Sequence, residues 1–203
     1  MTRLLLASAS PGRLATLRRA GVEPLVQVSG VDEELFLTTT PGTPAPAEAA
    51  LLLARAKAEA IAPTVADVVV VGCDSVLELD GVVHGKPSDA AEATERWRAM
   101  RGRSGVLHSG HWVVDRRTAD HRGATGAVAS TTVHFADVTD DEIGAYVATG
   151  EPLHVAGGFT IDGLGGAFVE GVEGDHHNVV GLSLPLLRRL LADLGVRWTD
   201  LWS

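Results

Sequence analysis

The residues of this sequence that could do chemistry begin at its first turn. The segment "LLLASASPGRL" places Ser8, Ser10 and Arg13 where an apolar strand gives way to a helix that Pro11 can start. Backbone N–H groups and hydroxyls at a helix N-terminus bind phosphate, and an arginine one turn into the helix can donate two hydrogen bonds to its oxygens. The alternative is that Ser10 only caps the helix and that Arg13 is solvated.

A second group is acidic. Asp74 follows the near-continuous β-branched run 67–72 and Cys73, and three carboxylates at positions 32, 33 and 34 lie together in "VDEEL". Oxygen ligands of this kind suit magnesium or manganese, and Asp74 could hold such an ion or take a proton from an attacking water. The alternative is that the acidic segment is solvated and that Asp74 caps the end of a strand.

The chain has only two lysines, Lys57 and Lys86. In the helix predicted over 46–62, Lys57 lies opposite the charged face, so it either reaches an edge of the apolar face or meets an anion in a cleft. We expect that anion to be present chiefly when a substrate is bound. Lys86, between Gly85 and Pro87, could neutralise charge on a phosphate or be merely exposed.

The histidines and the cysteine suggest no further site. No two histidines have a metal-binding spacing on one predicted helix, and His176 and His177 are expected to be solvated in a turn. Cys73 lies within an apolar strand, so we expect it to pack in the core rather than act as a nucleophile. The glycines follow no phosphate-loop or dinucleotide spacing.

Composition excludes several classes of protein. The 203 residues suffice for one buried core or two small lobes, and 17 basic against 26 acidic residues give a net charge of −9, which argues against a nucleic-acid partner. One cysteine excludes an internal disulfide. No apolar run approaches the ~20 residues of a membrane span or resembles a signal peptide, so we expect a cytoplasmic protein without a membrane partner.

Strands and helices alternate along the chain, which predicts a mixed α/β fold. The sequence predicts helices over 11–20, 46–62, 88–101, 139–149 and 182–194. It predicts strands over 3–8, 25–29, 67–72, 105–115 and 126–138, with a hairpin over 76–85 and connections over 31–46 and 116–123. Asp74 and Ser75 would then lie at the end of a core strand. The absence of repeats and linkers predicts that any lobes share one continuous sheet.

Several segments, taken in order, resemble the Maf family of nucleoside triphosphate pyrophosphatases between residue 3 and about residue 190. These segments are "LLLASASPGRL", "GVDEE", "LARAKA", "VVGCDSVLELDGVVHGKP", "YVATGEPLHVAGGFTIDGLGGAFVE" and "NVVGLSLPLL". The resemblance implies one domain over 1–203 with an elongated, two-lobed Maf/ITPase-like fold around a central cleft. It also implies a homodimer in many members.

The same resemblance implies cleavage of nucleoside triphosphates to a monophosphate and pyrophosphate with a divalent cation, Mg²⁺ or Mn²⁺, to remove non-canonical nucleotides. Asp74 matches the proton acceptor, and Glu33 with Asp74 would hold the metal. The remaining polar lining of the phosphate and metal site corresponds to Ser8, Arg13, Lys57 and Lys86. The alternative is a nucleotide-binding regulator of septum formation with little turnover.

Three positions depart from the pyrimidine-preferring members of that family. This chain has Gly12, Ser75 and Asp162 where those members have arginine, threonine and glutamine. An ionised Asp162 only accepts hydrogen bonds and so favours a base edge that offers donors, such as that of guanine. Gly12 is expected to leave room for a bulkier or modified base. We therefore expect UTP and dTTP not to be the best substrates.

Overall fold

A computed structural model describes residues 2–118 and 123–202, and their strands form one seven-stranded sheet. The strands are β1 (Leu4–Leu6), β2 (Leu25–Val26), β3 (Val68–Leu79), β4 (Val82–His84), β5 (Ser104–Arg116), β6 (Ala124–Phe135) and β7 (Val169–Glu173). Their order across the sheet is β2-β1-β3-β5-β6-β7, with β4 paired to β3. Part of the predicted connection 116–123 lies outside the described residues.

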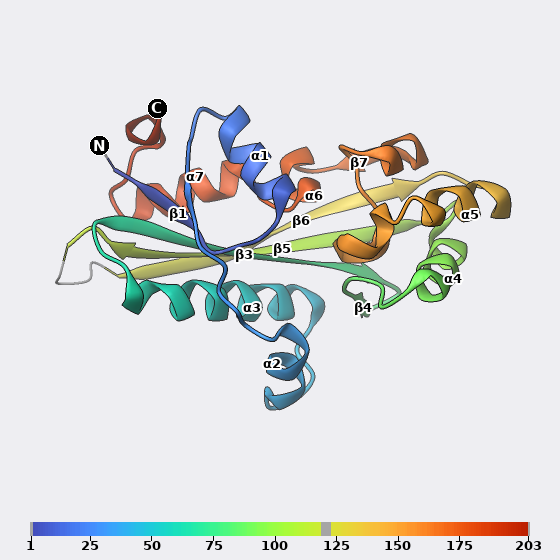
Figure 1. The fold of residues 1–203 in the computed structure, drawn as a ribbon, viewed down its shortest axis with the longest axis horizontal. Coiled ribbons are helices and arrows are strands. Elements are labelled where there is room, and N and C mark those ends of the chain that lie inside the picture. Colours follow the sequence, from blue (N-terminus) through green and yellow to red (C-terminus); the bar gives the residue numbers. More distant parts are fainter. Residues whose placement is uncertain (1, 119–122, 203) are drawn as a thin grey trace.

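The sheet is mixed, which confirms the predicted fold class. β1 pairs in parallel with β2 and with β3, whereas β3, β5, β6 and β7 form an antiparallel series. The predicted Asp-Gly hairpin is also confirmed, because β3 and β4 are antiparallel and Asp80 and Gly81 both have a positive φ. Because β3, β5 and β6 are long, the sheet runs the whole length of an elongated molecule (Figure 1).

Seven α-helices are described, and they cover the sheet on both faces and at one end (Figure 1). They are α1 (Pro11–Arg19), α2 (Glu33–Thr39), α3 (Pro46–Ile61), α4 (Ala90–Met100), α5 (Asp140–Ala148), α6 (His176–Val180) and α7 (Leu184–Asp193). α3 lies along one face of β3 and β5, α1, α6 and α7 lie on the opposite face, and α4 and α5 gather at the far end. None of the described helices is both long enough and apolar enough to span a bilayer.

Small residues let α3 approach the sheet closely. A Cβ at Gly72 of β3 would lie 2.1 Å from the carbonyl oxygen of Ala54, and a Cβ at Gly110 of β5 would lie 2.2 Å from that of Ala50. Glycine is therefore required at both positions for the helix backbone to rest directly on the strands. This close contact brings the next residues of α3 within reach of polar groups on β3.

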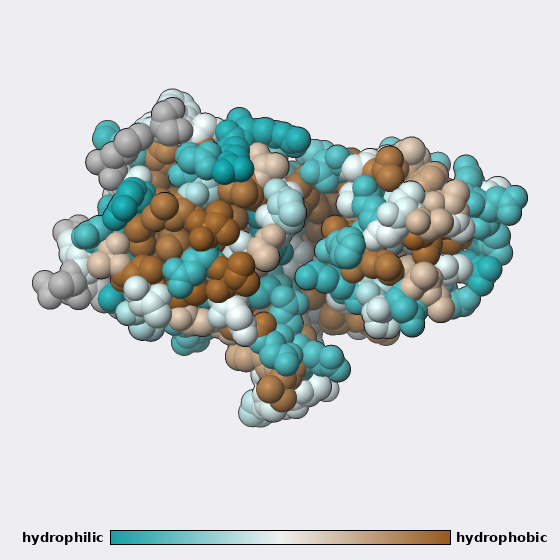
Figure 2. Space-filling model, viewed as in Figure 1, coloured by the Kyte–Doolittle hydropathy of each residue, from teal (hydrophilic) through white to brown (hydrophobic). Residues whose placement is uncertain are grey.

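The two ends of the molecule have separate apolar clusters. One packs β1, α1 and α7 together, and the other surrounds Trp97 of α4, whose indole meets Phe135, Tyr146 and Phe168 edge to face. Between these ends the surface is hollowed, in the region that β3 crosses (Figure 2). β3 runs from one cluster to the other: Cys73 belongs to the first and Leu77 to the second, so Asp74 lies between them.

Two features differ from the sequence predictions. The segment 31–46, expected to be a loop, contains helix α2, because Asp32 caps it by accepting from Leu35 N–H at 3.0 Å and two glutamates occupy its first turn. The glycine-rich tail, for which no element was predicted, contains β7 and α6.

Candidate active site

The centre of the candidate site is an ion-paired triad. The Nζ of Lys57 lies 2.5 Å from Oδ1 of Asp74 and 2.6 Å from Oε1 of Glu33. Lys57 and Asp74 are only 7% and 5% exposed, whereas the side chain of Glu33 is 43% exposed. One ammonium therefore gathers two carboxylates from distant parts of the chain.

Lys57 lies on the buried face of α3, as its position opposite the charged face predicted. Its anionic partners, however, are Asp74 and Glu33 of the protein itself. This corrects the expectation that its partner is present chiefly with bound substrate. The ammonium is neutralised before any ligand arrives, because a buried lysine without a partner would be unstable.

Asp74 is in the middle of β3 and not at its end, which corrects the sequence prediction. The strand continues through the first arm of the hairpin to Leu79, and Asp74 pairs with Gly110 of β5. The element that ends here is β1, whose pairing with β3 finishes where Ala7 N–H donates to Val71 O. The carboxylate of Asp74 thus lies just beyond the point where β1, the parallel neighbour of β3, ends. Ser8 comes directly after Ala7 at the end of β1.

Glu33 reaches the site from α2, where it is the first helical residue. The other two acidic residues of "VDEEL" do not join the triad: Asp32 caps the helix and Glu34 is exposed. The acidic cluster therefore contributes one carboxylate to the site, and the capping residue beside it sets the direction of the helix that carries it.

Arg13 organises the hydroxyls beside the triad. It is buried, and its guanidinium donates to Ser8 Oγ at 3.0 Å, to Ser75 Oγ at 3.0 Å and to the carbonyl of Gly181 at 2.8 Å. Ser10 also caps α1, so capping by Ser10 and a buried Arg13 occur together rather than as alternatives. Gly181 has a φ of +116°, and a Cβ there would lie 3.2 Å from Nε of Arg13.

A polar layer beneath Ser75 was not predicted from the sequence. The hydroxyls of Ser75 and Ser109 are 2.7 Å apart, and Ser109 donates to the carbonyl of Asn178 at 3.1 Å. His111 is fully buried and accepts from Ser183 N–H at 2.9 Å. The signal was available, because Ser109 and His111 alternate along one strand, but alternate polar residues are equally typical of a solvated sheet face.

Burial and charge shift the pKa values at the site in opposite directions. Burial raises the pKa of the Asp74 carboxyl above its usual value, and the nearby charges of Lys57 and Arg13 offset only part of that rise. Burial also acts to raise the pKa of Glu33, but the charge and hydrogen bond of Lys57, with the charges of Lys86 and Arg13, more than compensate and lower it. Asp74 is therefore the stronger proton acceptor of the two carboxylates.

Lys86 follows β4 and has an exposed side chain. Within the ranges 2–118 and 123–202 it makes no hydrogen bond or ion pair, although its charge helps to lower the pKa of Glu33. Of the residues that were predicted to surround the phosphates and metal, Ser8 and Arg13 bond each other, Glu33, Lys57 and Asp74 form the triad, and Lys86 is linked to them only through its charge. Lys86 differs from the rest because its ammonium is unpaired.

The three residues that were expected to contact the base lie in different surroundings. Ser75 belongs to the Arg13 network, whereas Asp162 is exposed in the turn between two short 3-10 helices, Ala156–Gly158 and Leu164–Phe168. A Cβ at Gly12 would lie 3.3 Å from both Cγ1 and the carbonyl oxygen of Val180. Val180 therefore takes the space beside Gly12, which corrects the expectation of room for a larger base there.

The cysteine and the paired histidines are peripheral to this chemistry. Cys73 is buried in the apolar cluster as predicted, and burial raises the pKa of its thiol to about 11. His176 and His177 are exposed as predicted, although they begin α6 rather than lie in a turn.

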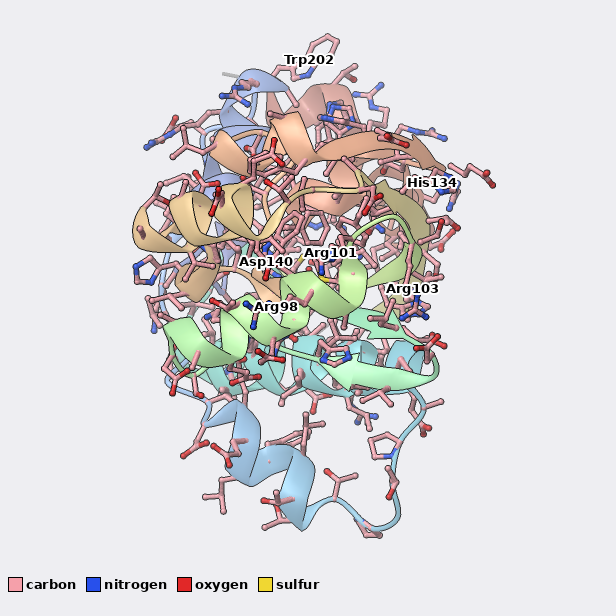
Figure 3. The ribbon with its side chains drawn as sticks, turned by 90° about the vertical axis from the view of Figure 1, so that its right-hand side faces the viewer. Arg98, Arg101, Arg103, His134, Asp140 and Trp202 are labelled. Atoms are coloured by element: carbon pink, nitrogen blue, oxygen red, sulfur yellow. The ribbon has the colours of Figure 1, made fainter. Side chains whose placement is uncertain are left out.

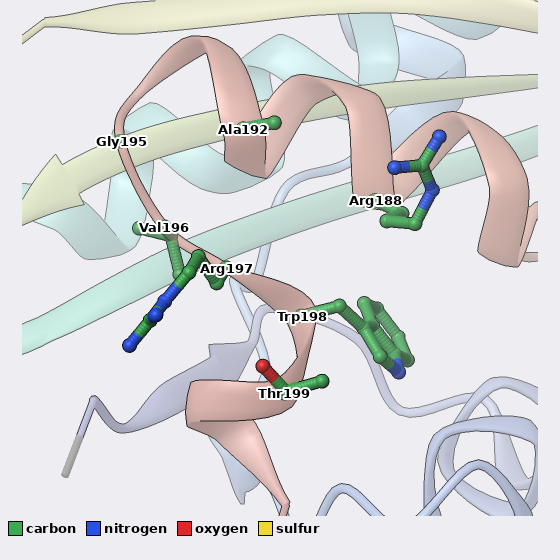
Figure 4. Close-up of a pocket in the computed structure, with 7 residues that line it drawn as sticks. All are labelled: Arg188, Ala192, Gly195, Val196, Arg197, Trp198 and Thr199. Carbon is green, nitrogen blue, oxygen red and sulfur yellow. The ribbon is translucent and has the colours of Figure 1, made fainter.

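Elsewhere, a pocket of about 410 Å³ lies between α7 and the C-terminal 3-10 helix and includes Arg188, Arg197 and Trp198 (Figure 4). It contains none of the triad residues. Its two arginine side chains point away from one another in Figure 4, and Arg197 is already paired with Asp200. They do not converge on a common anion, so the triad remains the better candidate site.

The two carboxylates of the triad have the oxygen chemistry that magnesium and manganese require. Both bond the same Nζ atom, so their oxygens converge on one small region. The described residues contain no cluster of three or more His, Cys, Asp or Glu side chains that could bind a metal by themselves. Glu33 and Asp74 therefore fit an ion that takes its other ligands from phosphates and water, as magnesium commonly does.

Comparison with known proteins identifies the family of the chain. The family described as "Maf-like protein" matches residues 3–194. The chain is 60% identical to a nucleoside triphosphate pyrophosphatase of Streptomyces coelicolor, over 99% of this chain and 95% of that protein, and 61% identical to one of Salinispora tropica, over 99% and 88%. It also resembles the Staphylococcus aureus Ham1 structure, with 13% identity, coverage of 99% and 94%, and a TM-score of 0.43. The extent of the match to the family and to these two relatives shows that the chain belongs to the Maf family.

Proposed function

We propose that this protein is a nucleoside triphosphate pyrophosphatase, which hydrolyses a nucleoside triphosphate to a monophosphate and pyrophosphate. The observation that carries the proposal is the buried Lys57–Asp74 pair beside Arg13, which combines a strong proton acceptor with fixed positive charge. The relatives in Streptomyces and Salinispora are named for this activity. The hydroxyl-rich turn at Ser8 supplies donors for phosphate oxygens.

Asp74 acts as the base. Its carboxylate takes a proton from a water that attacks the α-phosphorus, and the raised pKa of Asp74 makes it a better acceptor than an ordinary surface carboxylate. Lys57 bonds Oδ1 of Asp74 and so fixes the direction of the carboxylate. The bond between the α-phosphorus and the bridging oxygen then breaks, and the pyrophosphate departs with the electron pair of that bond.

Positive charge on the chain stabilises the departing pyrophosphate. Lys57, Lys86 and Arg13 surround the position for the phosphates, and their electrostatic effect supplies much of the rate acceleration in phosphoryl transfer. Ser8 accepts from Arg13 and from Ser10 N–H, so its own hydroxyl hydrogen is left to donate to a phosphate oxygen. Arg13 thus holds the hydroxyls in place as well as contributing charge.

Glu33 and Asp74 would hold the divalent cation, Mg²⁺ or Mn²⁺. When bound, such an ion neutralises charge on the phosphates and lowers the pKa of a coordinated water. Lys57, which bonds both of these carboxylates, would keep them oriented and add its own positive charge near the phosphates. Residues 1–203 form one domain with a cleft between two lobes. The protein assembles as a homodimer. It acts in the cytoplasm, where it removes non-canonical nucleotides.

The base is selected by donors on its edge. Asp162 lies exposed on a turn and makes no hydrogen bond to any residue in the described part of the chain, so it is available to accept from a ligand. A mismatched polar pair costs about 1–3 kcal/mol, which corresponds to roughly one to two decades of selectivity. We therefore propose that a guanine-type or modified-base triphosphate is used in preference to UTP and dTTP.

A pyrophosphate-release assay tests the proposal. Wild-type protein is given UTP, dTTP, CTP, GTP and 7-methyl-GTP with magnesium, and kcat/KM is compared. Release of one pyrophosphate for each monophosphate is expected, fastest with a guanine-type base. Binding without turnover for every triphosphate would instead indicate a nucleotide-binding regulator of septum formation. A preference for UTP or dTTP would refute the role of Asp162 alone.

A further inference from the structure

The unpaired ammonium of Lys86 is carried by an unusually constrained backbone. Gly85, directly before it, accepts two hydrogen bonds through its carbonyl: from Arg96 Nη1 at 2.5 Å and from Gly157 N–H at 2.9 Å. Pro87, directly after it, is buried and has its φ fixed by its ring. An exposed lysine in a turn normally has no such restraint on both sides.

Helix α4 supplies most of this restraint through one acidic and one basic residue. Glu92 accepts from both the backbone N–H and the hydroxyl of Ser88, at 2.7 and 2.8 Å, and it also pairs with Arg96. Arg96 is only 6% exposed. Its guanidinium therefore links Gly85, on one side of Lys86, to the carboxylate that holds Ser88 on the other side.

The same helix fixes the neighbouring glycine turn. Trp97, next to Arg96, donates from its indole N–H to the carbonyl of Gly158 at 2.8 Å. A Cβ at Gly158 would lie 3.2 Å from Cγ of Pro87, so the two segments are in direct contact. The turn that carries Lys86 is thus held between α4 and the glycine turn at 157–158.

α4 is in turn held against α5. Arg98 and Arg101 both donate to Asp140, the first residue of α5, at 3.0 and 2.7 Å (Figure 3). These pairs lie on the exposed side of α4 and do not involve the residues 85–88. α4 therefore has one arginine, Arg96, that contacts the Lys86 turn and another, Arg98, that pairs only with Glu95 and Asp140, which provides a matched control.

We propose that Arg96 is a positioning residue for Lys86: through the carbonyl of Gly85 it fixes the backbone from which the ammonium extends toward the phosphates of the substrate. The inference rests on the proposed role of Lys86 in binding the triphosphate. An ammonium that is flexibly attached loses its geometric advantage, and displacement of a charged group by about 1 Å can cost about a hundredfold in rate. Arg96 itself need not touch the substrate.

The test is a double-mutant cycle. Arg96→Met, Lys86→Ala and the double variant are compared by kcat/KM with the triphosphate that the pyrophosphate-release assay identifies, and by the Kd of its α,β-methylene analogue. We expect Arg96→Met alone to lower kcat/KM about tenfold, and to add less than about twofold in the Lys86→Ala background, because coupled residues give non-additive effects. Arg98→Met should stay within about twofold of wild type, since exposed ion pairs contribute little.

The outcomes separate the inference from the proposed function. An equal loss on Arg96→Met in both backgrounds would mean that Arg96 only stabilises the fold, and would overturn the inference while leaving Lys86 in its role. If Lys86→Ala has the kcat/KM and Kd of wild type, both the inference and the proposed role of Lys86 are overturned, whereas the proposed pyrophosphatase activity is not. If Arg96→Met does not fold, Arg96→Lys replaces it in the cycle, because lysine keeps the charge but cannot bond Gly85 and Glu92 together with a planar fork.

Discussion

The neutral state of His111 should make the stability of the protein fall in mild acid. The ring is 0% exposed; its Nε2 accepts from Ser183 N–H at 2.9 Å and its Nδ1 lies 3.0 Å from the carbonyl of Ser109. Because Nε2 must accept a hydrogen bond, the ring proton is on Nδ1. A second proton would remove the partner of Ser183 N–H, where α7 begins.

The size of the effect follows from the shift in pKa. Burial lowers the pKa of His111 from 6.5 to about 4. Between these values the unfolded chain binds a proton that the folded chain does not, so the free energy of unfolding rises with pH and is lost as the pH falls. A shift of this size corresponds to about 3 kcal/mol in full, of which about 2 kcal/mol is lost between roughly pH 7.5 and pH 5.

Urea unfolding at those two pH values measures this loss. We expect the pH dependence to be smaller by about 2 kcal/mol in His111→Gln, whose amide oxygen can still accept from Ser183, and unchanged in His176→Gln, which removes an exposed histidine. Other groups titrate equally in all three proteins, so the difference isolates His111. An NMR titration that gives His111 a pKa near 6.5, or equal pH dependence in wild type and His111→Gln, would refute the reasoning.

Three further predictions concern the triad. Asp74→Asn should lower kcat at least about a hundredfold while circular dichroism and the unfolding midpoint stay near wild type, because the base is lost but the side-chain volume is kept and Lys57 retains Glu33 as its anionic partner; near-normal turnover would remove Asp74 from the mechanism. Lys57→Met should lower both activity and the free energy of unfolding, the latter by about 3 kcal/mol, because Asp74 loses its buried partner; Arg55→Met, on the exposed side of the same helix, is the control, and unchanged urea midpoints for Lys57→Met would contradict the pairing. Exhaustive chelation should abolish pyrophosphate release and added magnesium should restore it, since the phosphates approach two carboxylates; persistent activity in EDTA would exclude the proposed cation.

Local sequence patterns predicted those parts of the site that depend on one element. Lys57 on the apolar side of α3, and Ser10 as the cap of α1, both follow from helical periodicity and capping. α2 was missed although its cap and acidic first turn are present in the sequence, because three threonines and the prolines after them are poor helix formers. In the structure each of those threonine hydroxyls bonds a carbonyl of the preceding turn, so the helix tolerates them.

Contacts between distant segments could not be predicted in this way. The bond from Arg13 to Gly181 joins residues 168 positions apart, and no local pattern marks either as the partner of the other. The error over Asp74 has a similar origin. An apolar run that becomes polar suggests the end of a strand. β3 nevertheless continues, because β5 pairs with the residues that precede Asp74 and with those that follow it.

Helix α2 has no buried residue, yet it carries Glu33, whereas Asp74 lies in a strand hydrogen-bonded to neighbours on both edges. Amide hydrogen exchange should therefore be fast throughout α2 and slowest in β3, since exchange follows the free energy of local opening. The two carboxylates of one triad are thus attached to a weakly protected helix and to a strongly protected strand. A ligand that engages Glu33 would slow exchange over the whole of α2, whereas β3 has little left to gain.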